Sequence, residues 1–204
     1  MGSGYVIGTQ KVIDHGAASD RFNLVLVAEG FQAGEIGDFS TQVEQFVNFL
    51  FTTPPFDSLS NAFNVYRVDV ASTESGADDP AACGGTGVTV DTYFDASFCN
   101  GNIRRLLLVD SNKVINTVDV EVPEWHQILV VVNSTIWGGA GGSIGTTSIS
   151  PGWENIAIHE MGHAAFGLAD EYEYWSGCSI DTDNAYYTGG EPAAPNVTIN
   201  TDHL

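Results

Sequence analysis

Two histidines lie four residues apart in an apolar segment, and this spacing constrains the fold more than any other feature of the chain. The segment, residues 154–166, follows Pro151 and contains the run from His159 through Glu160 to His163. On an α-helix, side chains four residues apart share one face, with Cβ atoms about 5–6 Å apart. Two imidazoles placed in this way reach one metal ion at about 2.0–2.1 Å each. The sequence therefore predicts a helix that presents a pair of metal ligands.

Glu160 adds a carboxylate beside the first of these histidines. From there it can lean over an open coordination position and accept a proton from a bound water. The His-Glu-x-x-His pattern arises by chance with a probability of roughly 0.006 in a chain of this composition. The alternative is a helix with two hydrogen-bonded histidines, because unpartnered histidines in a buried helix would be costly. We expect Zn²⁺ to be held by His159 and His163, with Glu160 as the general base.

A third ligand is expected just after the helix. Gly167 can end the helix, since glycine accepts the left-handed conformation of a C-cap. Asp170 is then the nearest carboxylate, with Glu171 one residue further. Two histidines, one carboxylate and a water make up a catalytic zinc site, so Asp170 is predicted as the third ligand. Asp170 as a capping carboxylate remains an alternative, as does Glu171 as the ligand or as a group hydrogen-bonded to a ligand histidine.

The rest of the chain alternates strand and helix patterns, separated by a long excursion at residues 71–100 that is too long for a simple connection. The order predicts an α/β (α+β) fold with one mixed, twisted sheet, whose last strand forms an edge over the helix of the histidines. No apolar run reaches 18 residues, so no membrane span is expected. The apolar patterns predict strands at 22–29, 63–70, 127–133 and 143–149, and helices at 35–51, 103–118 and 154–166.

A glycine-rich loop, residues 137–142, precedes the last predicted strand. An extended peptide can pair with an edge strand through backbone hydrogen bonds, and glycines let two backbones approach closely. A phosphate cradle is disfavoured, because no lysine follows as in a P-loop. A loop that contacts a substrate and a flexible turn remain as the two interpretations.

Charge and cysteine usage narrow the partners. The chain has 26 Asp and Glu but only 6 Lys and Arg, which gives a net charge of −20. This balance excludes the cationic surface that nucleic acids and anionic membranes require.

The cysteines are Cys83, Cys99 and Cys178, and none forms a zinc-type C-x-x-C pair. A disulfide between Cys83 and Cys99 would close a glycine-rich loop, and three separate thiols are the alternative.

The chain resembles the immunoglobulin-A-peptidase family of bacterial zinc metallopeptidases. The resemblance spans most of residues 20–200 and rests on five segments: 63–70, 72–80, 91–95, 137–142 and 159–172. It implies a zincin fold, zinc-dependent endopeptidase activity and a secreted, periplasmic or cell-surface location. It does not imply that immunoglobulin is the substrate.

The resemblance sets residues 1–20 apart as an N-terminal extension and makes 21–204 a zincin-like catalytic domain. The metzincin pattern, however, places glycine three and the third ligand six residues after the second histidine, where this chain has Phe166 and Ala169. No methionine follows the motif to form a Met-turn. The chain stops at residue 204 without an evident closing helix, so a C-terminal truncation is one expectation.

We therefore expect a zinc metalloendopeptidase that acts on protein or peptide substrates through a zinc-activated water. Tyr172 is a candidate for stabilising the oxyanion, although packing beside the site is the alternative role. A second hypothesis is a non-catalytic zincin-like module that binds peptide or glycan, with zinc as a structural ion. Such sites have four protein ligands, and Cys178 could supply the fourth. A third hypothesis is a zinc hydrolase that cleaves non-peptide amides.

Overall fold

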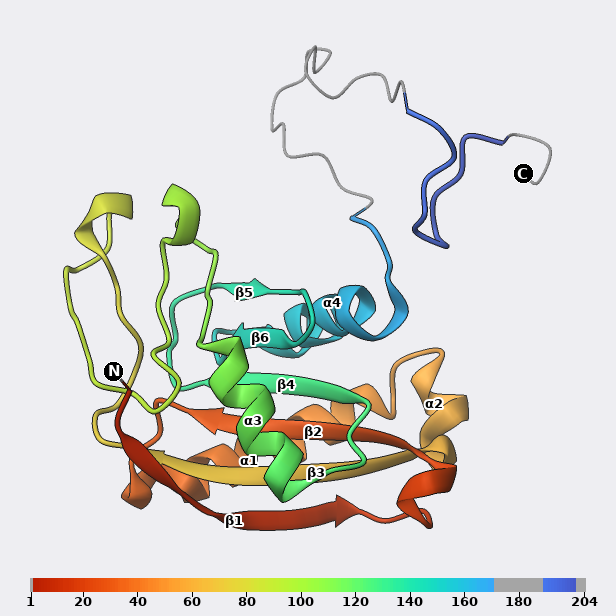
Figure 1. Ribbon diagram of the computed structural model, residues 1–204, viewed down its shortest axis with the longest axis horizontal. Helices are drawn as coiled ribbons and strands as arrows, with labels where there is room; N and C mark the ends of the chain where they lie inside the picture. The colour runs from red at the N-terminus through yellow and green to blue at the C-terminus, as the bar shows by residue number, and fades with distance from the viewer. Residues whose placement is uncertain (1, 171–188, 201–204) are drawn as a thin grey trace. The chain divides into compact units, whose positions relative to one another are not determined.

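The computed structural model describes residues 2–170 and 189–200, in two compact units, Met1–Ala165 and Phe166–Leu204. The first unit is built on one six-stranded sheet, ordered β1-β3-β2-β4-β6-β5 (Figure 1). The strands are β1 (Gly4–Ile13), β2 (Phe22–Glu29), β3 (Phe63–Ser72), β4 (Gln127–Val132), β5 (Gly139–Ala140) and β6 (Gly145–Ser148). The helices are α1 (Ile36–Leu50), α2 (Phe56–Leu59), α3 (Ser111–Glu121) and α4 (Trp153–Phe166).

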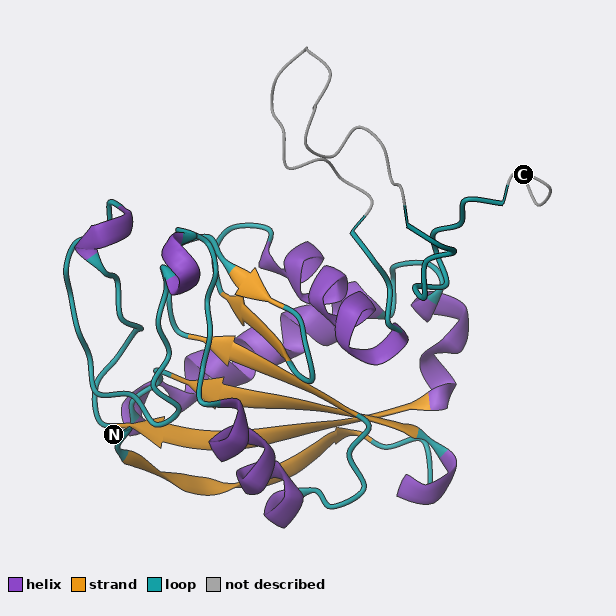
Figure 2. Cartoon of the chain, turned by 45° about the horizontal axis from the view of Figure 1, so that its top comes forward, coloured by secondary structure: helices purple, strands orange, loops and turns teal. Residues whose placement is uncertain are grey.

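The sheet is mixed, as the sequence predicts. Strands β3, β2, β4 and β6 run parallel, and β1 and β5 are antiparallel at the two edges. Helices cover both faces, as Figure 2 shows, with α3 in front of the sheet and α1 behind it in Figure 1. Strands covered on both faces need continuous apolar runs, and β2 and β4 are buried along almost their whole length. The predicted α/β (α+β) class is confirmed.

Helices α1 and α4 pack against each other on the same side of the sheet. The ring of Phe46 in α1 stacks on Trp153 of α4, with centroids 5.4 Å apart. The apolar face predicted for α1 is the face that is buried, and it consists of Phe39, Val43, Phe46, Val47 and Leu50. The contact with α1 fixes the first turn of the helix that carries the two histidines.

The helix expected at 103–118 is wrong in its first half. Helix α3 begins at Ser111, because the side chain of Asp110 caps it by accepting a hydrogen bond from Lys113 N at 3.0 Å. The preceding residues are extended: Leu107 N donates to Gly139 O, and Leu108 pairs with Ser97. In this stretch Leu107 is fully buried beside β5, whereas Ile103 and Leu108 are exposed.

The edge strand expected at 143–149 is also placed differently. Strand β6 lies inside the sheet, because β5 turns back and pairs with it antiparallel, with Gly139 opposite Thr147. The outer side of β5 is itself partly covered, since Gly139 N donates to Arg105 O at 3.2 Å. Two residues of the glycine loop thus form the edge strand over α4, and the sequence pattern did not reveal this.

Strand β1 forms the opposite edge and pairs with β3 from Gly4 to Ile13. The segment lies in the N-terminal extension expected at residues 1–20, and its pattern did not predict a strand.

The long excursion between β3 and α3, residues 73–110, is held by a disulfide and by a buried carboxylate. Cys83 and Cys99 form the disulfide, one of the two arrangements that the sequence left open. The carboxylate of Glu29, at the end of β2, accepts hydrogen bonds from the Thr92 hydroxyl and from two backbone N–H groups of the excursion. These contacts attach the excursion to the end of the sheet.

The second unit has little regular structure among its described residues. The side-chain amide of Asn196 makes two 2.9 Å hydrogen bonds with the backbone of Ala169, one as acceptor and one as donor. No helix among the described residues of the chain is long and apolar enough to cross a membrane.

Candidate metal site

Helix α4 presents one buried face and one face with the two histidines. It begins after a turn, with Trp153 N donating to Ser150 O at 2.9 Å, and the Trp153 indole N–H donates to Gln42 of α1. The buried residues recur at helical spacing and are Trp153, Ala157, Glu160 and Met161. Because this face is held by the core, the neighbouring face has a defined direction.

The rings of His159 and His163 converge. Their Nε2 atoms are 3.1 Å apart, and their ring centroids are 4.6 Å apart at an interplanar angle of 84°. Two ligands bound at about 2.0–2.1 Å to a tetrahedral ion lie about 3.3 Å apart. The pair therefore fits a single metal ion of zinc's size with only a small adjustment.

Glu160 completes the cluster on the inner side of the helix. One potential ligand atom from each of His159, Glu160 and His163 lies within 4.8 Å of the others. Glu160 is only 9% exposed, because β5 and β6 lie beside α4 (Figure 1). The arrangement brings two histidines that could hold a metal ion next to a largely buried carboxylate.

The glycine loop lies directly against this carboxylate. A Cβ atom on Gly139 would be 3.2 Å from Glu160 Oε1, and one on Gly141 would be 2.8 Å from Glu160 Oε2. A Cβ atom on Gly145 of β6 would be 3.6 Å from the Glu160 Cβ. The absence of side chains at these positions lets strand and loop approach the helix. The loop therefore packs against Glu160, whereas its contact with a substrate stays a prediction.

The prediction for the end of the helix is confirmed, whereas the third ligand stays a prediction. Helix α4 ends at Phe166, and Gly167 takes the left-handed conformation with φ = 64°. Asp170 is described and half-buried, but it belongs to the second unit. Glu171, Tyr172 and Cys178 lie outside the described residues.

Two features outside the metal cluster were missed by sequence reasoning. Trp137, just before the glycine loop, is 54% exposed, and the Arg105 guanidinium lies 5.9 Å from its ring centroid. Glu29 is fully buried, and burial raises the pKa of its carboxyl group above the ordinary value. The only feature of the sequence that could have indicated the burial of Glu29 is its position at the end of an apolar strand. No pattern in the sequence pointed to the pairing of Arg105 with Trp137.

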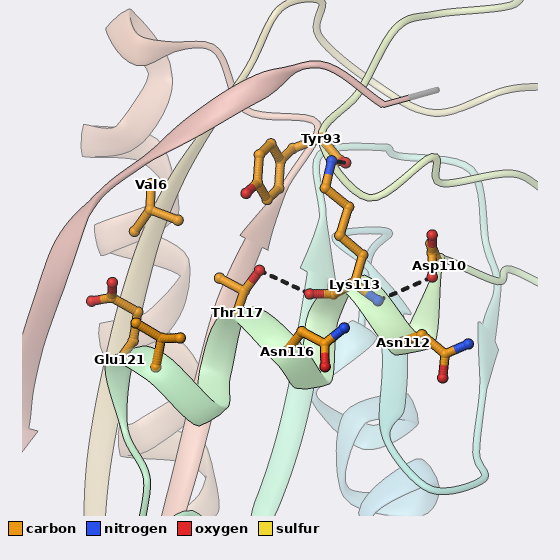
Figure 3. Close-up of a pocket in the computed structure, with 9 residues that line it drawn as sticks. Val6, Tyr93, Asp110, Asn112, Lys113, Asn116, Thr117 and Glu121 are labelled. Atoms are coloured by element: carbon orange, nitrogen blue, oxygen red, sulfur yellow. Dashed lines mark hydrogen bonds between the residues drawn. The ribbon is translucent and has the colours of Figure 1, made fainter.

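A separate hollow of about 520 Å³ lies between β1 and α3 (Figure 3). Its lining includes Val6, Tyr93, Lys113 and Glu121. Lys113 is engaged there, since its ammonium group donates to the backbone oxygens of Gly2 and Tyr93. The hollow contains no residue of the metal cluster, so its volume does not bear on the chemistry of α4.

Comparison with known proteins identifies one family. The family model described as IgA Peptidase M64 matches residues 11–204, which is nearly the whole chain and includes the complete cluster on α4. No curated protein matches the chain.

Proposed function

The chain belongs to the IgA peptidase M64 family, and from this we propose that it is a zinc-dependent endopeptidase with His159 and His163 as zinc ligands and Glu160 as the general base. One observation carries the proposal: the two histidine Nε2 atoms are 3.1 Å apart, beside a carboxylate that is 9% exposed. Two ligands one helical turn apart with an acid between them suit a metal-activated water.

The two histidines and Glu160 have separate roles in this proposal. A zinc ion bound here would lower the pKa of a coordinated water toward about 7 and polarise the scissile carbonyl. His159 and His163 would hold the ion through their ring nitrogens. Glu160 takes a proton from the attacking water and later delivers it to the leaving amine. Burial of Glu160 against β5 and the glycine loop restricts the orientation of its carboxylate, which favours proton transfer.

Asp170 is proposed as the third ligand. A carboxylate would leave the fourth position for water, as catalytic zinc sites require. Asp170 follows the left-handed turn at Gly167, which allows the chain to reverse its direction after the helix. The donor set would then be two imidazoles and one carboxylate.

We also propose that the enzyme works outside the cytoplasm, as a secreted, periplasmic or cell-surface protein. The disulfide between Cys83 and Cys99 supports this location, because disulfides persist in oxidising compartments. The net charge of −20 is suited to solubility and gives no basis for binding polyanions.

The test is a digest of a broad peptide library by the zinc-loaded protein, with and without a chelator, together with a metal assay. We expect hydrolysis that the chelator abolishes and zinc restores. Glu160→Gln should retain zinc and lose hydrolysis, whereas Glu154→Gln, on the same helix, should behave like the wild type. Absence of hydrolysis by the zinc-loaded wild type, or full turnover by Glu160→Gln, would reject the proposal.

A further inference from the structure

The glycine loop holds the reactive groups of α4 in place through one position in particular. We propose that Gly141 is a positioning residue of the metal site: because it has no side chain, the loop can press against both the Glu160 carboxylate and the His163 ring. The whole inference rests on the zinc site of the proposed function, but only its catalytic part requires that the protein cleaves peptides.

The space that a side chain at position 141 would need is already occupied. A Cβ atom there would lie 2.8 Å from Glu160 Oε2, 2.8 Å from His163 Cβ and 3.0 Å from His163 Cδ2. The carboxylate oxygen could rotate away, but that rotation would displace the general base. His163 Cβ is attached to the helix backbone and cannot rotate away. Cδ2 is bonded to Nε2, so a push on this edge of the ring also moves the metal-binding nitrogen.

The loop cannot simply retreat, because it is anchored two residues earlier. Gly139 donates its N–H to Arg105 O at 3.2 Å and accepts from Leu107 N at 3.4 Å. Gly138 O accepts a hydrogen bond from Ser148 N of β6 at 3.1 Å. Position 141 is therefore held close to α4 from both sides of β5, and a side chain there must displace groups of the site.

The next residue provides a matched control. A Cβ atom on Gly142 would meet nothing within 4 Å, and neither Gly141 nor Gly142 has a positive φ in the range that favours glycine. The same Gly→Ala change therefore costs little backbone strain at either position. Only the contact with Glu160 and His163 distinguishes the two substitutions.

The experiment compares Gly141→Ala with Gly142→Ala in the full chain, after circular dichroism confirms that each variant is folded. Zinc affinity is measured by competition with a chromogenic chelator. We expect Gly141→Ala to bind zinc about 10- to 100-fold more weakly, the range seen when groups that orient metal ligands are altered. Gly142→Ala should bind zinc as the wild type does. Equal affinities for the two variants would overturn the inference.

Peptide hydrolysis provides the second measurement. We expect kcat of Gly141→Ala to fall about 100-fold with KM unchanged, since a misplacement of about 1 Å in reacting groups has that effect. A change in KM alone would contradict a positioning role. If the wild type cleaves no peptide, the proposed function fails, but the zinc affinities still decide the role of Gly141.

The double variant Gly141→Ala/Glu160→Ala addresses the case in which Gly141→Ala does not fold. Removing the carboxylate frees part of the space that the new methyl group needs. The double variant is then compared with Glu160→Ala alone and should bind zinc more weakly, because the methyl group at position 141 still meets His163 Cβ and Cδ2. Equal zinc affinities of these two variants would overturn the inference. If the double variant also fails to fold while Gly142→Ala and Glu160→Ala fold, position 141 serves the fold rather than the site, and the inference is rejected.

Discussion

The hydroxyl of Thr92 donates a 2.6 Å hydrogen bond to Glu29 Oε1, which joins the excursion to a strand 63 residues earlier in the chain. The same carboxylate accepts hydrogen bonds from Phe94 N at 2.9 Å and Ala96 N at 3.1 Å. Glu29 is fully buried, so these donors replace the water that it loses on folding. One buried acid therefore fixes the path of the excursion, whose later residues cover the outer side of β5.

Replacing Glu29 by Gln should destabilise the protein. An amide NH₂ would take the place of one oxygen and face an N–H donor, leaving buried groups unsatisfied at a cost of about 1–3 kcal/mol each. Urea unfolding followed by circular dichroism measures the loss. Glu44→Gln on the exposed side of α1 is the control and should leave the free energy of unfolding unchanged. Equal stabilities of the two variants would contradict the role given to Glu29.

The pH dependence of stability should identify the same residue. Burial raises the pKa of Glu29 in the folded protein, so the folded state binds the proton more tightly than the unfolded chain does. The stabilisation that Glu29 gives the folded state is then fully present below the pKa that Glu29 has in the unfolded chain. It falls as pH rises through the pKa that Glu29 has in the folded protein. The difference in unfolding free energy between the wild type and Glu29→Gln should narrow as pH rises through this range. A difference that widens would reverse the sign and refute the assignment.

The sequence was informative where a local pattern determines the structure. The apolar spacing in α1 and the glycine at 167 describe features that depend on neighbouring residues, and both predictions are confirmed. Helix α3 was predicted too early, because the apolar residues near Leu107 have the spacing of a helix, although Leu107 itself packs beside β5. The Asp110 cap was the signal that could have placed its start.

Pairings between separate segments could not be read from the sequence. Only the folded sheet shows that Gly139 and Ala140 turn back over β6 and form the edge. The tight contact of Gly141 with Glu160 likewise depends on how the loop and α4 pack in the folded protein. The motif itself was informative, because the spacing of His159 and His163 on one helix decides their geometry, whatever the surrounding fold.

Loss of the disulfide should weaken the fold measurably. Cys83 and Cys99 are 16 residues apart in the sequence, and closing a loop of that length contributes about 3 kcal/mol by the loop-entropy model. We expect Cys83→Ser/Cys99→Ser to unfold at a lower temperature than the wild type and to be insensitive to reductant. Cys178→Ser should keep the wild-type response to reductant. A reductant effect that persists in the double variant would mean that another pairing carries the stability.

Gly30 should tolerate alanine less well than Gly101, another glycine with positive φ. Its φ is 69°, and a Cβ atom there would lie 2.0 Å from Gly76 O, whereas Gly101 has φ = 60° and open space around it. Backbone strain costs about 1–2 kcal/mol at either position, and the clash adds about 1–3 kcal/mol at Gly30 only. Urea unfolding of Gly30→Ala and Gly101→Ala separates the two contributions. Similar losses of unfolding free energy in both variants would show that the backbone around Gly76 moves and relieves the clash.

The stabilisation of the folded protein by zinc should distinguish a metal ligand, His163, from the general base, Glu160. A ligand that binds only the native state adds about 2.7 kcal/mol to the free energy of unfolding at 100 times its Kd. We expect zinc to raise the melting temperature of the wild type and of Glu160→Gln, since the carboxylate is assigned to proton transfer and not to binding. In His163→Ala the shift should vanish, because removing one of two converging imidazoles leaves an incomplete site. If Glu160→Gln lost the shift as completely as His163→Ala, Glu160 would be a ligand, and the assignment of the general base would have to be abandoned.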